Sequence, residues 1–162
     1  MNKSIYSKYV FYFFLFFSIF TLDRISKIYI LNIANNEELN IYINEFLNII
    51  LIWNTGIGFG LLSFSDNFLY NAITFIILLI NFVLIYLAVA SNSIKRILYI
   101  VILGGSFGNL FDRFYYSAVP DFIDINFNGY HWFVFNVADI FISIGITCLI
   151  FMEILDYKKF SK

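Results

Sequence analysis

Long apolar stretches dominate the chain, and four of them have the length that a membrane-spanning helix needs. They cover about residues 9–32, 68–90, 97–115 and 137–157. Each holds close to the roughly 20 mainly apolar residues that cross the hydrocarbon core of a bilayer. The second is the cleanest, because no charged residue occurs between Asn67 and Ile94. The pattern therefore predicts an all-α membrane protein with four transmembrane helices.

The segment between the first two stretches has a different pattern. Residues 33–67 begin polar, then alternate or run apolar through 41–43 and 49–53, and end in a glycine-rich turn. Such runs are typical of β-strands. We expect a small extracytoplasmic β-sheet here, lying on the membrane between helices 1 and 2. Residues 116–136 are expected to join the third and fourth helices, and residues 1–162 to form one integral membrane domain.

Composition agrees with lipid as the surrounding solvent. Hydrophobic residues make up 61% of the chain and charged residues only 13%, whereas a soluble domain carries about 25% charged residues. With a net charge of −1, the chain has no excess of basic residues that would attract nucleic acid. Cys148 and His131 are the only residues of their types, so they offer neither an internal disulfide nor a metal site. No metal or cofactor is expected.

The basic residues predict the orientation in the membrane. In a four-span arrangement one side carries most of them: Lys3, Lys8, Lys95, Arg96, Lys158, Lys159 and Lys162. Only Arg24, Lys27 and Arg113 fall at the other end. The positive-inside rule then predicts that both termini are cytoplasmic. No small-residue cleavage site follows the first apolar stretch, so we interpret it as an uncleaved span.

Ionisable residues at membrane depth are candidate functional residues, because each costs about 2.5–3.5 kcal/mol to insert. Asp23 and Lys27 on the first span, Asp112 and Arg113 on the third, and Asp139 on the fourth all fall near the outer end. A structural interpretation of each is also available. Asp23 and Lys27 have the i to i+4 spacing of a local ion pair, and Asp139 suits an N-terminal cap.

The positions of these acids favour catalysis by a pair of carboxylates. Asp139 opens a helix in apolar surroundings, and Asp121 begins the stretch that leads back to it, with Asp124 as a nearby competitor. Two carboxylates about 3 Å apart share one proton, so that one can act as a base and the other as an acid. Serine catalysis is disfavoured, because His131 has no G-x-S-x-G elbow beside it.

Two glycine-rich stretches carry a further signal. Residues 54–60 do not complete a dinucleotide-binding G-x-G-x-x-G motif, because Leu61 stands at the position of the third glycine. Gly104 and Gly108 form a G-x-x-x-G pattern, which is typical of a helix-packing face. Packing there would bring Asn109 and Asp112 against a neighbouring helix, so packing and function both stay open for this stretch.

Five short motifs follow one another along the chain. They are D-x-x-S-K at 23–27, N-x-G-x-x-F at 54–59, G-G-x-x-G-N-x-x-D-R at 104–113, P-D-F at 120–122 and F-N-x-A-D at 135–139. In this order and at these spacings they resemble the lipoprotein signal peptidase family, also called signal peptidase II. Each motif alone is short, but the resemblance covers nearly the whole chain.

The resemblance implies a metal-independent aspartic endopeptidase with Asp121 and Asp139 as its catalytic pair. It implies a set of residues that bind the substrate: Asn54, Gly56, Asn109, Arg113 and Asn136. It also implies a set that supports the architecture: Asp23, Lys27, Gly108, Asp112 and Ala138. The implied substrate is a prolipoprotein signal peptide, cut just before a cysteine that carries diacylglycerol. The expected setting is a monomer among the lipids of the bacterial cytoplasmic (inner) membrane, with its site near the outer face.

Three positions depart from the family pattern, and two other functions remain as alternatives. Gly58 replaces an alanine, Pro120 a valine beside Asp121, and Phe133 a proline. A metal-dependent lipid-head-group transferase would need aspartates at helical spacing on one face, which this chain lacks. A small membrane transporter or channel subunit would use buried acids for ions or protons. The cytoplasmic halves of the predicted spans, however, hold only Glu153 and Asp156, near the end of the fourth.

Overall fold

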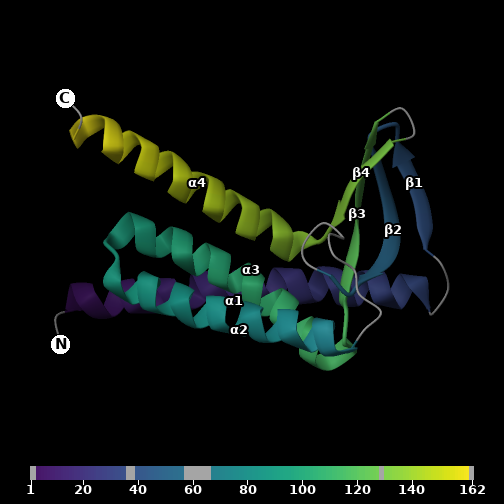
Figure 1. The fold of residues 1–162 in the computed structure, drawn as a ribbon, viewed down its shortest axis with the longest axis horizontal. Helices are drawn as coiled ribbons and strands as arrows, with labels where there is room; N and C mark the ends of the chain where they lie inside the picture. Colours follow the sequence, from purple (N-terminus) through teal and green to yellow (C-terminus); the bar gives the residue numbers. More distant parts are fainter. Residues whose placement is uncertain (1–2, 36–38, 57–66, 128–129, 161–162) are drawn as a thin grey trace.

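The computed structural model describes residues 3–35, 39–56, 67–127 and 130–160. Its helices are α1 (Lys3–Ala34), α2 (Asn67–Ala90), α3 (Ser93–Tyr116) and α4 (Val137–Phe160). All 4 contain a segment long and apolar enough to cross a membrane, which confirms the four-span prediction. In Figure 1 a β-sheet stands at one end of the helices, and both chain termini lie at the opposite end.

Helix α3 is the central element of the helical part, since it packs against α1, α2 and α4. Small residues permit this close packing. A Cβ atom on Gly108 would lie 2.4 Å from the Asp23 carboxylate of α1, and one on Gly105 would lie 2.5 Å from the Ala138 carbonyl of α4. The predicted glycine face, with Gly104 against α1 as well, therefore serves helix packing and brings α3 against its neighbours at the depth of the buried charges.

The sheet has four antiparallel strands in the order β1-β2-β3-β4. They are β1 (Asn40–Asn44), β2 (Leu47–Asn54), β3 (Val119–Phe127) and β4 (Tyr130–Phe135). The small sheet predicted between the first two helices is confirmed. The segment of residues 116–136 joins the third and fourth helices as expected, and it also supplies β3 and β4 of the sheet, which the sequence pattern did not predict.

Pro120 explains why the strand pattern of β3 is hidden in the sequence. Proline cannot donate to a β-ladder and normally argues against an interior strand. Pro120 pairs with Trp53 of β2, but the pairing of β3 with β4 extends only from Ile123 to Phe127. The proline therefore lies where β3 has a paired strand on one side alone, and there the missing donor is tolerated.

Polar side chains are inside the helical part and large apolar side chains are outside it. Asp23, Lys27 and Asp112 are fully buried, whereas Tyr86 and Val89 of α2 are about 70% and 73% exposed. An apolar outer surface suits lipid, which has no water to solvate charged groups. Asp23 accepts from the backbone N–H of Ala138, which lies in the first turn of α4 directly after β4. The buried charges therefore lie at the sheet end of the helices, and this end is where the site is built.

Candidate active site

Asp121 and Asp139 face one cavity of about 430 Å³ between the sheet and the helices. Asp121 lies in β3 and Asp139 in the first turn of α4. Four further polar residues of the predicted set line the cavity: Asn54, Asn109, Arg113 and Asn136. Its remaining wall is largely isoleucine, from α2 and α4 (Ile77, Ile80, Ile142 and Ile146). The fold thus brings together two acids that stand eighteen residues apart.

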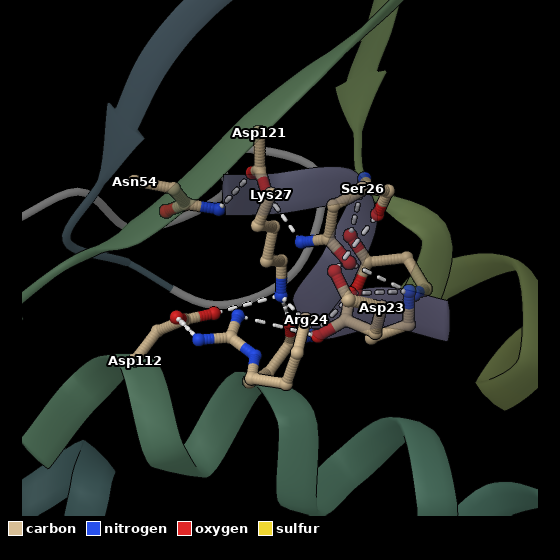
Figure 2. A network of polar contacts seen from close by, with 11 residues as sticks. Asp23, Arg24, Ser26, Lys27, Asn54, Asp112 and Asp121 are labelled. Atoms are coloured by element: carbon tan, nitrogen blue, oxygen red, sulfur yellow. Dashed lines mark hydrogen bonds and ion pairs between the residues drawn. The ribbon is translucent and has the colours of Figure 1, made fainter. Parts of the chain in front are cut away.

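Asp121 is buried and held by two side-chain amides. The Nδ2 atom of Asn136 donates to Oδ1 at 2.6 Å, and the Nδ2 atom of Asn54 donates to Oδ2 at 2.8 Å (Figure 2). Burial, and then the negative charge of Asp139, raise the pKa of Asp121 from 3.8 to about 7. Near neutral pH this carboxyl can therefore hold a proton that an ordinary aspartic acid has lost.

Asp139 is fixed by the start of its own helix. Asn136 is the N-cap of α4, because its Oδ1 atom accepts from the backbone N–H of Asp139 at 3.1 Å. In return Oδ2 of Asp139 accepts from the backbone N–H of Asn136 at 3.1 Å. This reciprocal pair is a capping box. Asp139 therefore occupies the third helical position, not the cap position that its residue type also favours.

Amide N–H groups reach every carboxylate oxygen of the pair. Besides the three donors already described, Nδ2 of Asn109 donates to Oδ1 of Asp139 at 2.8 Å. Asn136 binds both acids at once, through its side chain and its backbone. The two carboxyls are therefore held in place by α3, β2 and the turn between β4 and α4.

A buried lysine ties this arrangement to α1 and α3. The ammonium of Lys27 donates to Oδ2 of Asp23 at 2.9 Å, to Oδ2 of Asp112 at 2.7 Å and to Oδ1 of Asn109 at 2.7 Å. Figure 2 shows Lys27 reaching down between these helices. A lysine ammonium has three N–H donors, and all three are used. Lys27 thus compensates two buried carboxylates together with Arg24, whose guanidinium lies 2.6 Å from Asp112 and 3.4 Å from Asp23.

The contact between Lys27 and Asn109 also decides how the Asn109 amide is turned. Lysine can only donate, so the amide oxygen must face Lys27, and the amide nitrogen is left to face Asp139. Asp23 adds a second link to α4, because its Oδ1 atom accepts from the backbone N–H of Ala138 at 3.0 Å. The interpretation of Asp23 and Lys27 as only a local ion pair is therefore too narrow.

Arg113 braces the turn that follows β2. Its Nη2 atom donates to the carbonyl of Gly56, and the N–H of Gly56 donates to Oδ1 of Asn54 at 2.8 Å. The guanidinium also lies 5.5 Å from the centre of the Tyr70 ring. The turn thereby presents Asn54 to Asp121. Gly58 and Phe59, which belong to the same predicted motif, lie outside the described residues.

Asp124, the competitor for the pair, belongs to a different cluster. It is buried, but its Oδ2 atom contacts Asn48 at 3.2 Å and Nδ1 of His131 at 2.7 Å. It does not line the cavity that holds Asp121 and Asp139. Of the two remaining departures, Pro120 is buried in β3 and Phe133 is 46% exposed in β4. Neither one removes a polar group from the site.

Two serines and the isoleucine wall also line the cavity, and no sequence motif predicted that they would. Ser106 lies inside the glycine-rich box of α3, and Ser143 faces the cavity from α4. The isoleucines recur at intervals of three or four residues, at 77 and 80 and at 142 and 146. That spacing places the isoleucines on one face of a helix. In an apolar span, however, the spacing does not tell whether that face lines a cavity or contacts lipid.

Comparisons with known proteins point to one family. The family model for signal peptidase (SPase) II matches residues 15–155. The chain is 51% identical to the lipoprotein signal peptidase of Pelagibacter ubique over 85% of its length and 83% of the relative's. It is 37% identical to that of Anaplasma phagocytophilum, over 82% of its own length and 84% of the relative's.

Solved structures agree with this likeness. One bacterial membrane enzyme, whose structure was obtained by the in meso method, superposes with a TM-score of 0.74 at 28% identity, covering 91% of this chain and 90% of that one. A second bacterial membrane enzyme, obtained by the same method, gives a TM-score of 0.67 at 27% identity, with 87% of this chain and 90% of that one covered.

Proposed function

Because this chain belongs to the signal peptidase II family, we propose that it is an aspartic endopeptidase acting on diacylglyceryl-modified prolipoproteins, which it cuts just before the lipidated cysteine. The observation that carries the proposal is the pair of buried carboxyls, Asp121 and Asp139, on one cavity with apolar walls. Amide groups surround both acids. Hydrolysis by such a pair uses only water and the two side chains.

The proposal gives the two acids different roles. Asp121 carries the shared proton, since burial and the neighbouring charge raise its pKa to about 7. Asp139 carries the negative charge, since a neighbouring pair of carboxyls holds one proton between them and Asp121 carries it. Asp139 takes a proton from water as the water oxygen attacks the scissile carbonyl carbon. Asp121 protonates the carbonyl oxygen, which yields a neutral tetrahedral intermediate.

Collapse of the intermediate completes the proposed reaction. The C–N bond breaks, and the proton that Asp139 had taken passes to the departing amine of the lipidated cysteine. A hydroxyl of the intermediate returns its proton to Asp121, which regenerates the starting pair. We assign the substrate backbone to Arg113 and Gly56, and to the Asn54, Asn109 and Asn136 amides that also hold the acids. The isoleucine wall would receive the apolar part of the substrate.

The rest of the proposal concerns the setting. We place the enzyme in the bacterial inner membrane as a monomer surrounded by lipid, with the sheet and the acid pair at the outer face. The basic residues support this orientation. Lys95 and Arg96 lie at the start of α3, and the other end of α3 leads into the sheet. A lipid-bearing substrate lies at the same interface as this site.

A gel-shift cleavage assay in detergent or lipid tests the function. The substrate is a prelipoprotein, prepared with and without diacylglyceryl on its cysteine, and the products are sequenced to locate the cut. Wild type is compared with Asp121→Asn and Asp139→Asn, and a parallel reaction contains a chelator. We expect cleavage of the lipidated form only, in the presence of the chelator as well, and none by either variant.

Asp124→Asn is the matched control, because Asp124 is an equally buried aspartate of β3 that does not line the cavity. It should retain activity. Loss of wild-type activity with the chelator would contradict the metal-independent pair. No cleavage by folded wild type would favour the transporter alternative.

A further inference from the structure

Two serines line the catalytic cavity and take no part in holding the acids. Ser106 of α3 lies three residues before Asn109. Ser143 of α4 lies four residues after Asp139. Because α3 leads into β3 and α4 follows β4, both serines lie about one helical turn further from the sheet than the acid pair. The cavity therefore has a second polar layer, deeper among the helices than the first.

Both hydroxyls are available to an occupant of the cavity. Neither one has a hydrogen-bond partner among the described residues, although a helical serine can bond to a carbonyl of its own preceding turn. Ser143 is exposed, and Ser106 is half-buried with its hydroxyl oxygen still accessible. The cavity's three asparagine side chains, in contrast, already donate to the acids. The second layer thus offers two reachable donors that the protein itself does not use.

The surroundings of these donors define what can use them. The wall at this depth is apolar and consists of Ile77 and Ile80 of α2 and Ile142 and Ile146 of α4. A polar group without a partner is costly in such a place, and lipid supplies no acceptor. A hydroxyl is a neutral donor, so a carbonyl oxygen suits it. The occupant therefore presents unpaired carbonyl oxygens at this depth, together with apolar side chains.

The end of a transmembrane helix has both properties. The last four carbonyl groups of any helix have no partner within the helix, and inside a membrane no water replaces that partner. In the proposed function, on which this inference rests, the signal peptide leaves its helix just before the cut, so that water and both acids reach the scissile bond. The last carbonyls of that helix then lie about one turn below the acids, which is the level of the serines.

We propose that Ser106 and Ser143 cap the C-terminal end of the signal-peptide helix, by donating hydrogen bonds to its last backbone carbonyls. The isoleucine wall contacts the apolar side chains of the same turn. Because every helix end carries such carbonyls, the two serines recognise a backbone conformation and not a particular side chain. They bind substrate and take no part in proton transfer.

Equilibrium binding to a variant without turnover tests the proposal. The probe is a fluorescent synthetic signal peptide with diacylglyceryl on its cysteine, and fluorescence polarisation in one detergent gives its Kd for the Asp139→Asn protein. Adding Ser106→Ala or Ser143→Ala should weaken binding about 3- to 10-fold each, the loss of one hydrogen bond. Ser143→Thr keeps a hydroxyl and should restore the binding. Thr147→Ala, at an exposed position of α4 outside the cavity lining, should leave it unchanged.

A second peptide separates backbone from side-chain recognition. Every residue in its last turn before the cut is alanine or leucine, so that no side chain there can accept a hydrogen bond. Both serine substitutions should weaken its binding by the same factor as before. An effect that appears only with serine or threonine in that turn would overturn the proposal, as would equal binding by all variants.

Two further measurements separate this role from folding and from the peptidase activity. Neither alanine variant should have a lower melting temperature, because the two hydroxyls have no partner among the described residues; a clear drop would indicate a structural role instead. Cleavage by wild type is measured on the same peptide. Cleavage without any effect of the serines on binding would reject the helix cap alone. Serine-dependent binding without cleavage would reject the peptidase activity alone.

Discussion

The carboxyl of Asp121 is buried beside that of Asp139, and burial together with the neighbouring charge raises its pKa to about 7. In the proposed mechanism this group supplies the proton, so kcat/KM should fall as the pH rises above about 7. The apparent pKa of that fall belongs to the pair and not to one acid. Cleavage rates measured from pH 5 to pH 9 test this. A profile that stays flat to pH 9 would argue against a shared proton.

The same raised pKa predicts how stability depends on pH. The unfolded chain loses the Asp121 proton near pH 3.8 and the folded chain near pH 7. The folded state therefore binds more protons in this window, and its stability falls as the pH rises through it. Asp121→Asn removes this effect. Its stability relative to wild type should rise by about 2–3 kcal/mol between pH 5 and pH 8.

Melting temperatures of the two purified proteins in one detergent, at several pH values, measure that difference. A constant offset is expected in addition, because an asparagine amide cannot accept from both Asn54 and Asn136 as the carboxylate does. Only the change with pH is diagnostic. A difference that is the same at pH 5 and pH 8 would mean that Asp121 is ionised throughout this range.

Lys27 belongs to the architecture more than to the chemical step. Its ammonium compensates Asp23 and Asp112, both fully buried, so Lys27→Ala leaves two buried negative charges with one fewer partner. A broken buried ion pair costs about 3–5 kcal/mol. We expect a large drop in thermal stability, and a smaller change in the turnover of the molecules that remain folded.

Lys95→Ala is the control for this lysine variant. Lys95 pairs with Glu153, whose side chain is largely exposed, and its loss should change stability little. Melting temperatures, together with cleavage rates per folded molecule measured below both melting temperatures, would separate stability from turnover. A Lys27→Ala protein that is as stable as wild type but inactive would show that its main role is catalytic.

At the scale of elements, the position of α4 against α3 depends on glycine. A Cβ atom at Gly105 would lie 2.5 Å from a backbone oxygen of α4, that of Ala138, one residue before Asp139. Backbone cannot move aside without shifting the helix, so Gly105→Ala should displace α4 and the acid that it carries. Overpacking of this kind costs about 1–3 kcal/mol, and the proposed activity should fall strongly.

Gly145→Ala is a graded comparison for the same interface. Its added methyl would first meet the side chain of Ile102, at 2.4 Å, and a side chain can adopt another rotamer. It also lies further along α4 from the acid pair. Melting temperature and cleavage rate should therefore change less than for Gly105→Ala. Equal damage from both substitutions would mean that the interface responds to total volume and not to the position of Ala138.

At the scale of the whole molecule, orientation in the membrane decides which compartment the acid pair meets. The positive-inside rule predicts that the turn between α2 and α3 is cytoplasmic and that the sheet is outside. In a Cys148→Ala background, Ser91→Cys marks that turn, and Glu45→Cys marks the turn between β1 and β2. A membrane-impermeant maleimide should label the Glu45 variant in spheroplasts and the Ser91 variant only after lysis. The reverse pattern would invert the proposed topology.

The membrane class, the spans and most of the residues around the acids follow from the amino-acid sequence alone. Length and apolarity identify a spanning helix without tertiary information, because such a helix satisfies its own backbone hydrogen bonds. Acids such as Asp139 can also be identified from the sequence, because a charged group within an apolar stretch is costly to insert into a membrane. The order of the motifs then pointed to the family.

How these residues meet in space depends on tertiary packing. Whether Asp121 pairs with Asp139 while Asp124 pairs with His131 depends on the register of β3, and a shift of one residue turns each side chain to the other face. The strand itself was hidden by Pro120, whose tolerance depends on where β4 begins to pair. The reach of Lys27 across to Asn109 depends on how closely glycine lets α3 approach. Contacts between distant segments depend on packing, and local pattern does not encode it.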